Sequence, residues 1–295
     1  MLNSQRDQMW EEFTPLWTEL LTLNALLLIC GGYGLYLKQR WLLNPEQRQA
    51  PIIVGLDRWR DVVPRTTKDV DLIVGIEIIA DAGNSKNCAQ ILTNHGFKAT
   101  KQNPRWQFEK MLPKEQHILV ELHCSPPPSA LANVSTDRTR IKHSPSLKGA
   151  GIHGKTNPEA VGSDLHPFSF AIENLSFRVP NSLTWCVMKL TAMDDRWQRA
   201  MDLGRDQSNR AFSREQAMKH AQDVCRIIAL TTRDESDNLD EVKAALESTP
   251  EFVKACRIVA TLNDNSLILA TVKQQWSEED FNTIRLLLSR WFQES

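Results

Sequence analysis

The stretch DVDLIVGIEII at residues 69–79 constrains the fold of this chain more than any other. Its β-branched residues predict a strand over residues 70–79. Asp69 and Asp71 stand at the start of this segment, and a spacing of two places both carboxylates on one face of a strand. Such carboxylates repel each other unless a cation lies between them, and oxygen clusters of this kind suit Mg²⁺. A solvated turn without metal is the alternative interpretation.

A pair of glycines, Gly31 and Gly32, directly follows a short apolar run at residues 26–30. The run predicts a buried strand, and residues 33–41 predict a helix. Glycines at a strand-to-helix turn let backbone N–H groups approach a phosphate, and the helix N-terminus favours negative charge. The alternative is a tight turn that holds no ligand.

A third carboxylate, Glu121, lies within HILVELH at residues 117–123, which is expected to be another strand. His123 falls on the same face of that strand because side chains alternate. Glu121 could complete a metal site or act as a general base on an acceptor hydroxyl. An exposed strand glutamate without such a role is the alternative.

The order of the expected elements predicts an α+β protein. Strands and helices alternate over residues 1–180, which we expect to form a catalytic domain, with a mobile insertion at 125–165 that is rich in Ser, Pro, Gly and basic residues. Residues 181–295 show helical periodicity and are expected to form a helical domain. The 295 residues fit one large domain or two smaller ones.

The charge pattern gives one local signal. The net charge of −1 does not indicate a nucleic-acid partner. Residues 138–155, however, lack acids and could contact an RNA backbone, unless they are only a solvated insertion. Their basic residues are Arg138, Arg140, Lys142, His143, Lys148, His153 and Lys155.

Cysteine spacing and hydropathy exclude several classes of protein. The six cysteines form no CxxC pair, so neither a zinc ribbon nor a redox dithiol is expected, and we predict buried thiols in a reducing compartment. The most apolar stretch, residues 25–37, is interrupted by glycines and is shorter than the roughly 20 residues of a membrane-spanning helix. No signal peptide is visible. We therefore expect a soluble, cytoplasmic protein with no membrane partner.

The order of these motifs resembles a known superfamily. A GG pair, then Arg-x-Thr-x-Asp-x-Asp-Leu at residues 65–72, then a carboxylate on a later strand is similar to the DNA polymerase β-like nucleotidyltransferases. The AbiEii/AbiGii toxin-like branch, which contains toxins of some type IV toxin–antitoxin systems, is most similar. VMKLTAMDDR at 187–196 and KHAQDVCRI at 219–227 resemble two helices of that branch. Gly32 replaces a common serine, Glu121 replaces a commoner aspartate, and the gap before Asp69 is long.

The resemblance implies a nucleotidyltransferase-type mixed sheet with flanking helices, followed by a C-terminal helical bundle. It implies Mg²⁺-dependent transfer of NMP from an NTP to an acceptor hydroxyl, with two ions, tRNA or another acceptor, and an antitoxin protein as a partner. The implied residues are Asp69, Asp71 and Glu121 for metal; Gly31, Gly32, Arg65, Lys68 and Lys189 for the nucleotide; and Asp223 as a support of the site.

Two other functions stay open at this point. An antibiotic- or metabolite-modifying nucleotidyltransferase would use the same chemistry on a small molecule. A degenerate, non-catalytic member would bind nucleotide or RNA without transfer. Lys189 and Asp223 each lie in an amphipathic helix, where an ordinary surface charge is the alternative interpretation.

Overall fold

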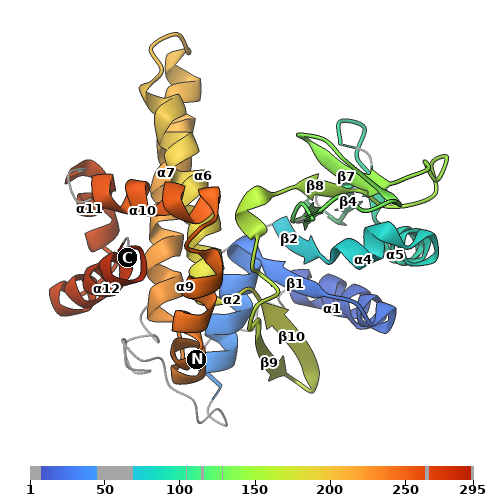
Figure 1. Ribbon diagram of the computed structural model, residues 1–295, viewed down its shortest axis with the longest axis horizontal. Coiled ribbons are helices and arrows are strands. Elements are labelled where there is room, and N and C mark those ends of the chain that lie inside the picture. The colour runs from blue at the N-terminus through green and yellow to red at the C-terminus, as the bar shows by residue number, and fades with distance from the viewer. Residues whose placement is uncertain are drawn as a thin grey trace. The chain divides into compact units, whose positions relative to one another are not determined.

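The computed structural model describes residues 8–44, 69–103, 105–113, 116–127, 129–262 and 266–293. Contacts between residues divide the chain into two compact units (Figure 1). Unit 1 comprises Met1–Gly34, Thr66–Pro158 and Ala171–Arg178, and unit 2 comprises Leu35–Arg65, Glu159–Phe170 and Val179–Ser295. The predicted division at residue 180 into a catalytic and a helical domain stays a prediction.

A mixed sheet forms the centre of unit 1. Its strands are β1 (Leu27–Cys30), β2 (Asp69–Val74), β3 (Lys98–Ala99), β4 (Gln107–Met111), β5 (His117–Cys124), β6 (Val134–Thr136), β7 (Arg140–His143) and β8 (Gly154–Thr156). Their order is β1-β2-β5-β8-β7-β6, and β4 pairs with both β3 and β5. The β2–β5 and β5–β8 pairs are parallel, whereas the other pairs are antiparallel. The expected mixed sheet is confirmed.

Helices flank this sheet in unit 1. They are α1 (Gln8–Leu20), the short helix η1 (Leu21–Leu23), α4 (Ile76–Ala80) and α5 (Ala82–Asn94) (Figure 1). Helix α1 buries an apolar stripe that includes Phe13, Leu16 and Trp17. The Trp17 indole N–H donates to the carbonyl oxygen of Ser176 at 2.8 Å, so its one polar atom is satisfied in the core.

The strand expected over residues 70–79 is shorter than predicted. It ends at Val74, and α4 follows after Gly75. The Glu77 carboxylate accepts a 2.8 Å hydrogen bond from the backbone N–H of Leu26, and a Cβ at Gly75 would lie 2.2 Å from a Glu77 oxygen. Glycine at this position therefore lets the chain turn into a helix despite the β-branched residues that follow.

The segment expected to be a mobile insertion, residues 125–165, contains β6, β7 and β8. Strand β8 pairs with the last two residues of β5, and β7 and β6 extend the sheet outward from it. A short helix, η3 (Pro158–Ala160), follows. Strands β6, β7 and β8 of this segment are thus part of the sheet, and the mobility of the segment stays a prediction.

Unit 2 is a bundle of helices, as expected. Its helices are α6 (Ser182–Met201), α7 (Gln207–Ala229), α8 (Arg233–Asp237), α9 (Leu239–Leu246), α10 (Pro250–Leu262), α11 (Ser266–Lys273) and α12 (Glu278–Trp291) (Figure 1). Helices α6 and α7 form the central pair, against which α10, α11 and α12 pack. Helix α2 (Gly31–Leu42) and the hairpin of β9 (Phe168–Ile172) and β10 (Leu175–Val179) have residues in both units.

A buried ion pair joins α2 to α8 within unit 2. Lys38 of α2 donates to both carboxylate oxygens of Glu235 at 2.6 Å, and Glu235 also accepts from the hydroxyl of Ser182. Glu235 completes a capping box with Thr232 at the start of α8. The Glu235 carboxylate thus accepts from several donors, and the Lys38 ammonium donates to both of its oxygens, which is the condition for burying the two charges.

All six cysteines are buried and free, as predicted. Burial raises the pKa of the Cys88 thiol to about 12, so this group is a neutral, apolar core side chain. Within the described ranges, every helix is too short or too polar to cross a membrane.

Candidate metal centre

Parallel pairing of β2 with β5 places the candidate ligands side by side. The register sets Asp71 opposite Glu121 and Ile73 opposite His123. Since side chains alternate along each strand, these register positions put Asp71, Glu121 and His123 on one face of the sheet. Asp71 and Glu121 are far apart in the sequence, and this strand pairing brings them together.

The three side chains converge on a small volume. His123 Nε2 lies 3.4 Å from Asp71 Oδ1 and 3.4 Å from Glu121 Oε2. One ligand atom from each residue lies within 4.8 Å of the other two. Neighbouring ligands around one divalent ion are about 3–3.5 Å apart, so the cluster needs little adjustment to hold a metal.

The imidazole and the two carboxylates of the cluster shift each other's pKa values. Burial by itself would lower the pKa of His123, but hydrogen bonding to Asp71 and Glu121 outweighs it and raises that pKa above its ordinary value. Burial would raise the pKa of Glu121, but its hydrogen bond with His123 and the charge of Lys155 outweigh burial and lower it. The cluster therefore attracts a positive charge, which a metal ion would also supply.

Neighbouring strands orient Glu121. Gln107 of β4 donates to Glu121 Oε1 at 2.6 Å, and Lys155 of β8 donates to Oε2 at 3.2 Å. The Gln107 side-chain carbonyl in turn accepts from Thr100 and Asn103 at 3.0 and 3.1 Å. Partners of this kind hold a carboxylate in one orientation and are typical of ligands in metal sites.

Gly31 packs directly against the cluster. It follows Cys30, which pairs with Asp71 across β1 and β2, and it begins helix α2. Its φ is +67°, and a Cβ there would lie 1.9 Å from Asp71 Oδ2. Gly32, the next residue of α2, is buried. The predicted glycine pair is thus beside the candidate metal ligands, at a helix N-terminus whose first N–H groups have no partner within the helix.

The other predicted residues lie as follows. Asp69 begins β2, is exposed, and shares the Asp71 face about 7 Å further along the strand, outside the cluster of three. Arg65 and Lys68 lie outside the described residues. Lys189 and Asp223 belong to unit 2, where they form a buried ion pair at 2.9 Å, and their role in catalysis stays a prediction.

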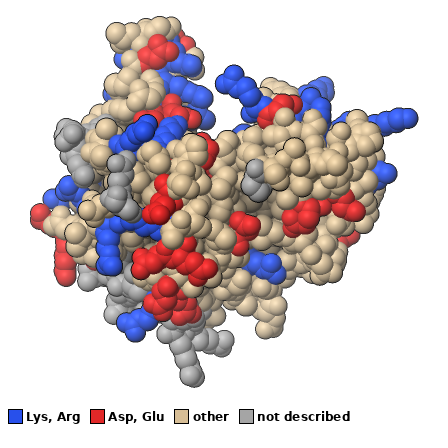
Figure 2. Space-filling view, in the orientation of Figure 1, with Lys and Arg blue, Asp and Glu red and all other residues tan. Residues whose placement is uncertain are grey.

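Basic side chains surround β7 and β8. Burial, and to a smaller degree the positive charges of Arg105, Arg140 and Lys142, together lower the pKa of His153 to about 4, against the weaker opposite effect of Asp137. The contribution of these three cations is evidence that positive charge gathers on this part of unit 1. Figure 2 shows Lys and Arg side chains projecting along the β7–β8 side of that unit, interspersed with acids.

His123, a member of the cluster, and Gln107, which donates to Glu121, were not predicted as site residues. Gln107 carries no sequence signal, because its role depends on the pairing of β4 with β5. His123 does have a sequence signal, since it shares a strand face with Glu121. Periodicity cannot reveal, however, that β2, which contains Asp71, lies next to that strand.

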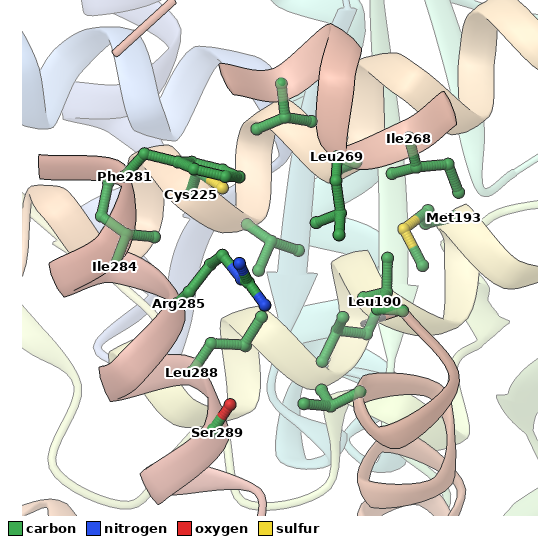
Figure 3. A pocket seen from close by; sticks show the side chains of 15 residues that line it. Leu190, Met193, Cys225, Ile268, Leu269, Phe281, Ile284, Arg285, Leu288 and Ser289 are labelled. Atoms are coloured by element: carbon green, nitrogen blue, oxygen red, sulfur yellow. The ribbon is translucent and has the colours of Figure 1, made fainter. Parts of the chain in front are cut away.

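A small cavity lies within unit 2, among α6, α7, α10, α11 and α12 (Figure 3). Leucine, isoleucine, valine and phenylalanine dominate its lining, and Arg285 contributes a guanidinium group. Its volume of about 30 Å³ is roughly the space that one water molecule occupies in the liquid. The cavity is a gap in helix packing and is too small to bind a nucleotide.

Comparison with known proteins gives one distant likeness. No protein-family model matches the sequence, and no curated protein does. Among solved structures, the chain is similar to an antigenic nucleotidyltransferase-like protein from Paracoccidioides brasiliensis, with a TM-score of 0.35 and 14% identity. The match covers 82% of this chain and 92% of that one. At this TM-score, the likeness assigns neither fold nor activity to the chain.

Proposed function

We propose that the chain is a metal-dependent nucleotidyltransferase that moves NMP from an NTP to an acceptor hydroxyl. The observation that carries this proposal is the convergence of Asp71, Glu121 and His123 beside Gly31, at the N-terminus of α2. This places a cation-binding cluster next to backbone N–H groups that favour phosphate, and a nucleotidyl transfer site needs both.

The reaction forms a bond between the acceptor oxygen and the α-phosphorus of the NTP, and it breaks the bond from that phosphorus to the bridging oxygen. Pyrophosphate leaves, and the hydroxyl proton passes to solvent or to a base. Bound Mg²⁺ would lower the pKa of the hydroxyl and neutralise charge on the leaving group. Asp69, Asp71 and Glu121 would hold two such ions.

The contacts of Glu121 support a role in metal binding rather than as a base. Both of its oxygens already accept hydrogen bonds, from Gln107 and Lys155, and its pKa is lowered. A general base at neutral pH instead needs a raised carboxyl pKa. We therefore assign Glu121 to the metal shell.

The chain would hold the triphosphate from several sides. Gly31 and Gly32 would contact it through backbone N–H groups, because a side chain at residue 31 would fill the approach to Asp71. Arg65 and Lys68 would add positive charge next to Asp69 in the sequence. The resemblance of the sequence further assigns a nucleotide-binding role to Lys189, supported by Asp223.

The acceptor we propose is an RNA, with tRNA as the first candidate. The positive potential around Arg105, Arg140 and Lys142 supports a polyanionic acceptor. A role as the toxin of a type IV toxin–antitoxin system, with an antitoxin protein as partner, rests on the resemblance of the sequence to AbiEii/AbiGii toxins.

Label transfer from each of the four α-³²P NTPs tests this function. Total tRNA, total protein and a panel of small molecules would serve as acceptors with Mg²⁺, and Asp71→Asn and Glu121→Gln would be compared with wild type. Glu109→Gln, a strand carboxylate outside the cluster, is the matched control. We expect labelled tRNA from wild type and the control, and at least a hundredfold less from the two cluster variants.

Other outcomes discriminate among the alternatives. Label on a small molecule instead of RNA would identify a metabolite- or antibiotic-modifying enzyme. Nucleotide binding with no labelled product from any acceptor would refute catalysis and leave a binding module.

A further inference from the structure

We propose that the Asp71–Glu121–His123 cluster binds Mn²⁺ in preference to Mg²⁺. The inference deepens the proposed function, because it gives the two metal positions of that site different identities. The binding preference itself does not depend on catalysis and can be measured without nucleotide.

The donor set is the first reason. The cluster offers two carboxylate oxygens and one imidazole nitrogen. Mg²⁺ is a hard ion that takes oxygen ligands and retains several waters, so an imidazole contributes little to its binding. First-row transition ions bind imidazole well, and Mn²⁺ also accepts carboxylates and water. A mixed nitrogen and oxygen set therefore favours Mn²⁺ over Mg²⁺.

The fixed position of the imidazole is the second reason. His123 sits between two paired strands, opposite Ile73 of β2 and Lys155 of β8, and its side chain is only 12% exposed. Nε2 faces both carboxylates, whereas Nδ1 is buried without a hydrogen-bond partner among the described residues. Nε2 is thus the ring nitrogen placed to bind metal.

The open side of the cluster is the third reason. Asp71 is 29% exposed, so solvent or phosphate oxygens can approach the cluster on that side. Among the described residues the cluster contains no cysteine, the ligand that is common in structural Zn²⁺ sites. Three protein ligands with an open side leave room for the water or phosphate oxygens that Mn²⁺ also accepts.

The remaining carboxylate, Asp69, lies outside the cluster and offers oxygen only. With Asp71 and the phosphate oxygens of an NTP, it makes a hard donor set of the kind that Mg²⁺ prefers. The Mg²⁺ of the proposed reaction therefore belongs with the nucleotide, and the Mn²⁺ belongs with His123.

Metal titration of the full chain without nucleotide tests this inference. After removal of metal with a chelator, calorimetry would give affinities for Mn²⁺, Mg²⁺ and Zn²⁺, and pulsed EPR of bound Mn²⁺ would detect a nitrogen ligand. We expect wild type to bind Mn²⁺ at least tenfold more tightly than Mg²⁺, with a clear nitrogen coupling. His123→Gln should lose at least tenfold in Mn²⁺ affinity and change Mg²⁺ affinity less than threefold.

His117→Gln is the matched control, because His117 is an exposed residue at the other end of the same strand, and it should bind metal as wild type does. Equal Mn²⁺ and Mg²⁺ affinities, Mn²⁺ bound without nitrogen coupling, or a Zn²⁺ preference without a Mn²⁺ preference would each overturn the inference. The nitrogen coupling is read in wild type, so the test survives if His123→Gln does not fold.

The outcomes also separate this inference from the proposed function. Labelled tRNA together with equal Mn²⁺ and Mg²⁺ affinities would refute only the ion preference. Nitrogen-coupled Mn²⁺ without any labelled product would refute the transfer reaction and leave the metal centre.

Discussion

Replacing Gly31 by alanine should damage the metal centre although it leaves all three candidate ligands in the sequence. The new Cβ would lie 1.9 Å from Asp71 Oδ2 and 2.8 Å from Asp71 Cγ. Because Cγ also overlaps, rotation of the carboxylate about its own bond cannot relieve the clash. The whole Asp71 side chain must turn about Cα–Cβ, which removes its oxygen from the 3.4 Å contact with His123 Nε2.

The expected cost has two parts. A non-glycine residue at a φ of +67° costs about 1 kcal/mol. Loss of the charge-assisted contact between Asp71 and His123 adds about 1.5 kcal/mol, reduced because both side chains are partly exposed. The free energy of unfolding should thus fall by about 2–3 kcal/mol, and metal affinity should fall at least tenfold because one of three ligands has moved.

Gly96→Ala supplies the matched control for this prediction. Gly96 has a φ of +82°, but its Cβ would meet only the flexible end of Lys110, at 3.5 Å. This variant should lose about 1 kcal/mol of stability and keep wild-type metal affinity. Urea unfolding and calorimetric titration with Mn²⁺ would measure both quantities. Wild-type metal binding by Gly31→Ala would refute the reasoning, whatever its stability.

Two further predictions concern buried charges. Lys189→Met should lower the free energy of unfolding by about 3 kcal/mol, because it removes the cation that lies 2.9 Å from the Asp223 carboxylate, which is 1% exposed, and adding Asp223→Asn should recover part of that loss in urea unfolding. A loss below about 1 kcal/mol would contradict this. The pKa of His153 is lowered to about 4 from 6.5, so below pH 6.5 the unfolded chain binds a proton that the folded chain does not, and stability falls with pH down to about 4. His153→Gln should remove about 1 kcal/mol of the difference in stability between pH 7 and pH 5, and identical pH profiles would refute the assignment.

Parts of the site were predictable because they depend on strand periodicity alone. The spacing of Asp69 and Asp71, and that of Glu121 and His123, fixes which side chains share a face once each segment is a strand. The glycine pair was predictable from another local feature, because it directly follows an apolar strand. These local rules predicted the individual strands, the carboxylates and the helical C-terminal half, whereas the mixed sheet was expected from the resemblance to nucleotidyltransferases.

Other parts depend on contacts between distant segments. Parallel pairing in the register Asp71 opposite Glu121 turns two separate carboxylates into a cluster, and a shift of one residue would move Glu121 to the opposite face. His123 and Gln107 acquire their roles only through that pairing. The end of the strand at Val74 likewise depends on Glu77 reaching the backbone of Leu26, which local propensity does not contain.

A crystal structure of the chain with Mn²⁺ and a non-hydrolysable NTP analogue would test the central claim most directly. We predict an anomalous Mn²⁺ peak bound by Asp71, Glu121 and His123 Nε2, with the triphosphate contacting the backbone N–H groups at Gly31 and Gly32. A peak bound by other residues, or a triphosphate bound away from the start of α2, would contradict the assignment of this cluster as a nucleotidyl transfer centre.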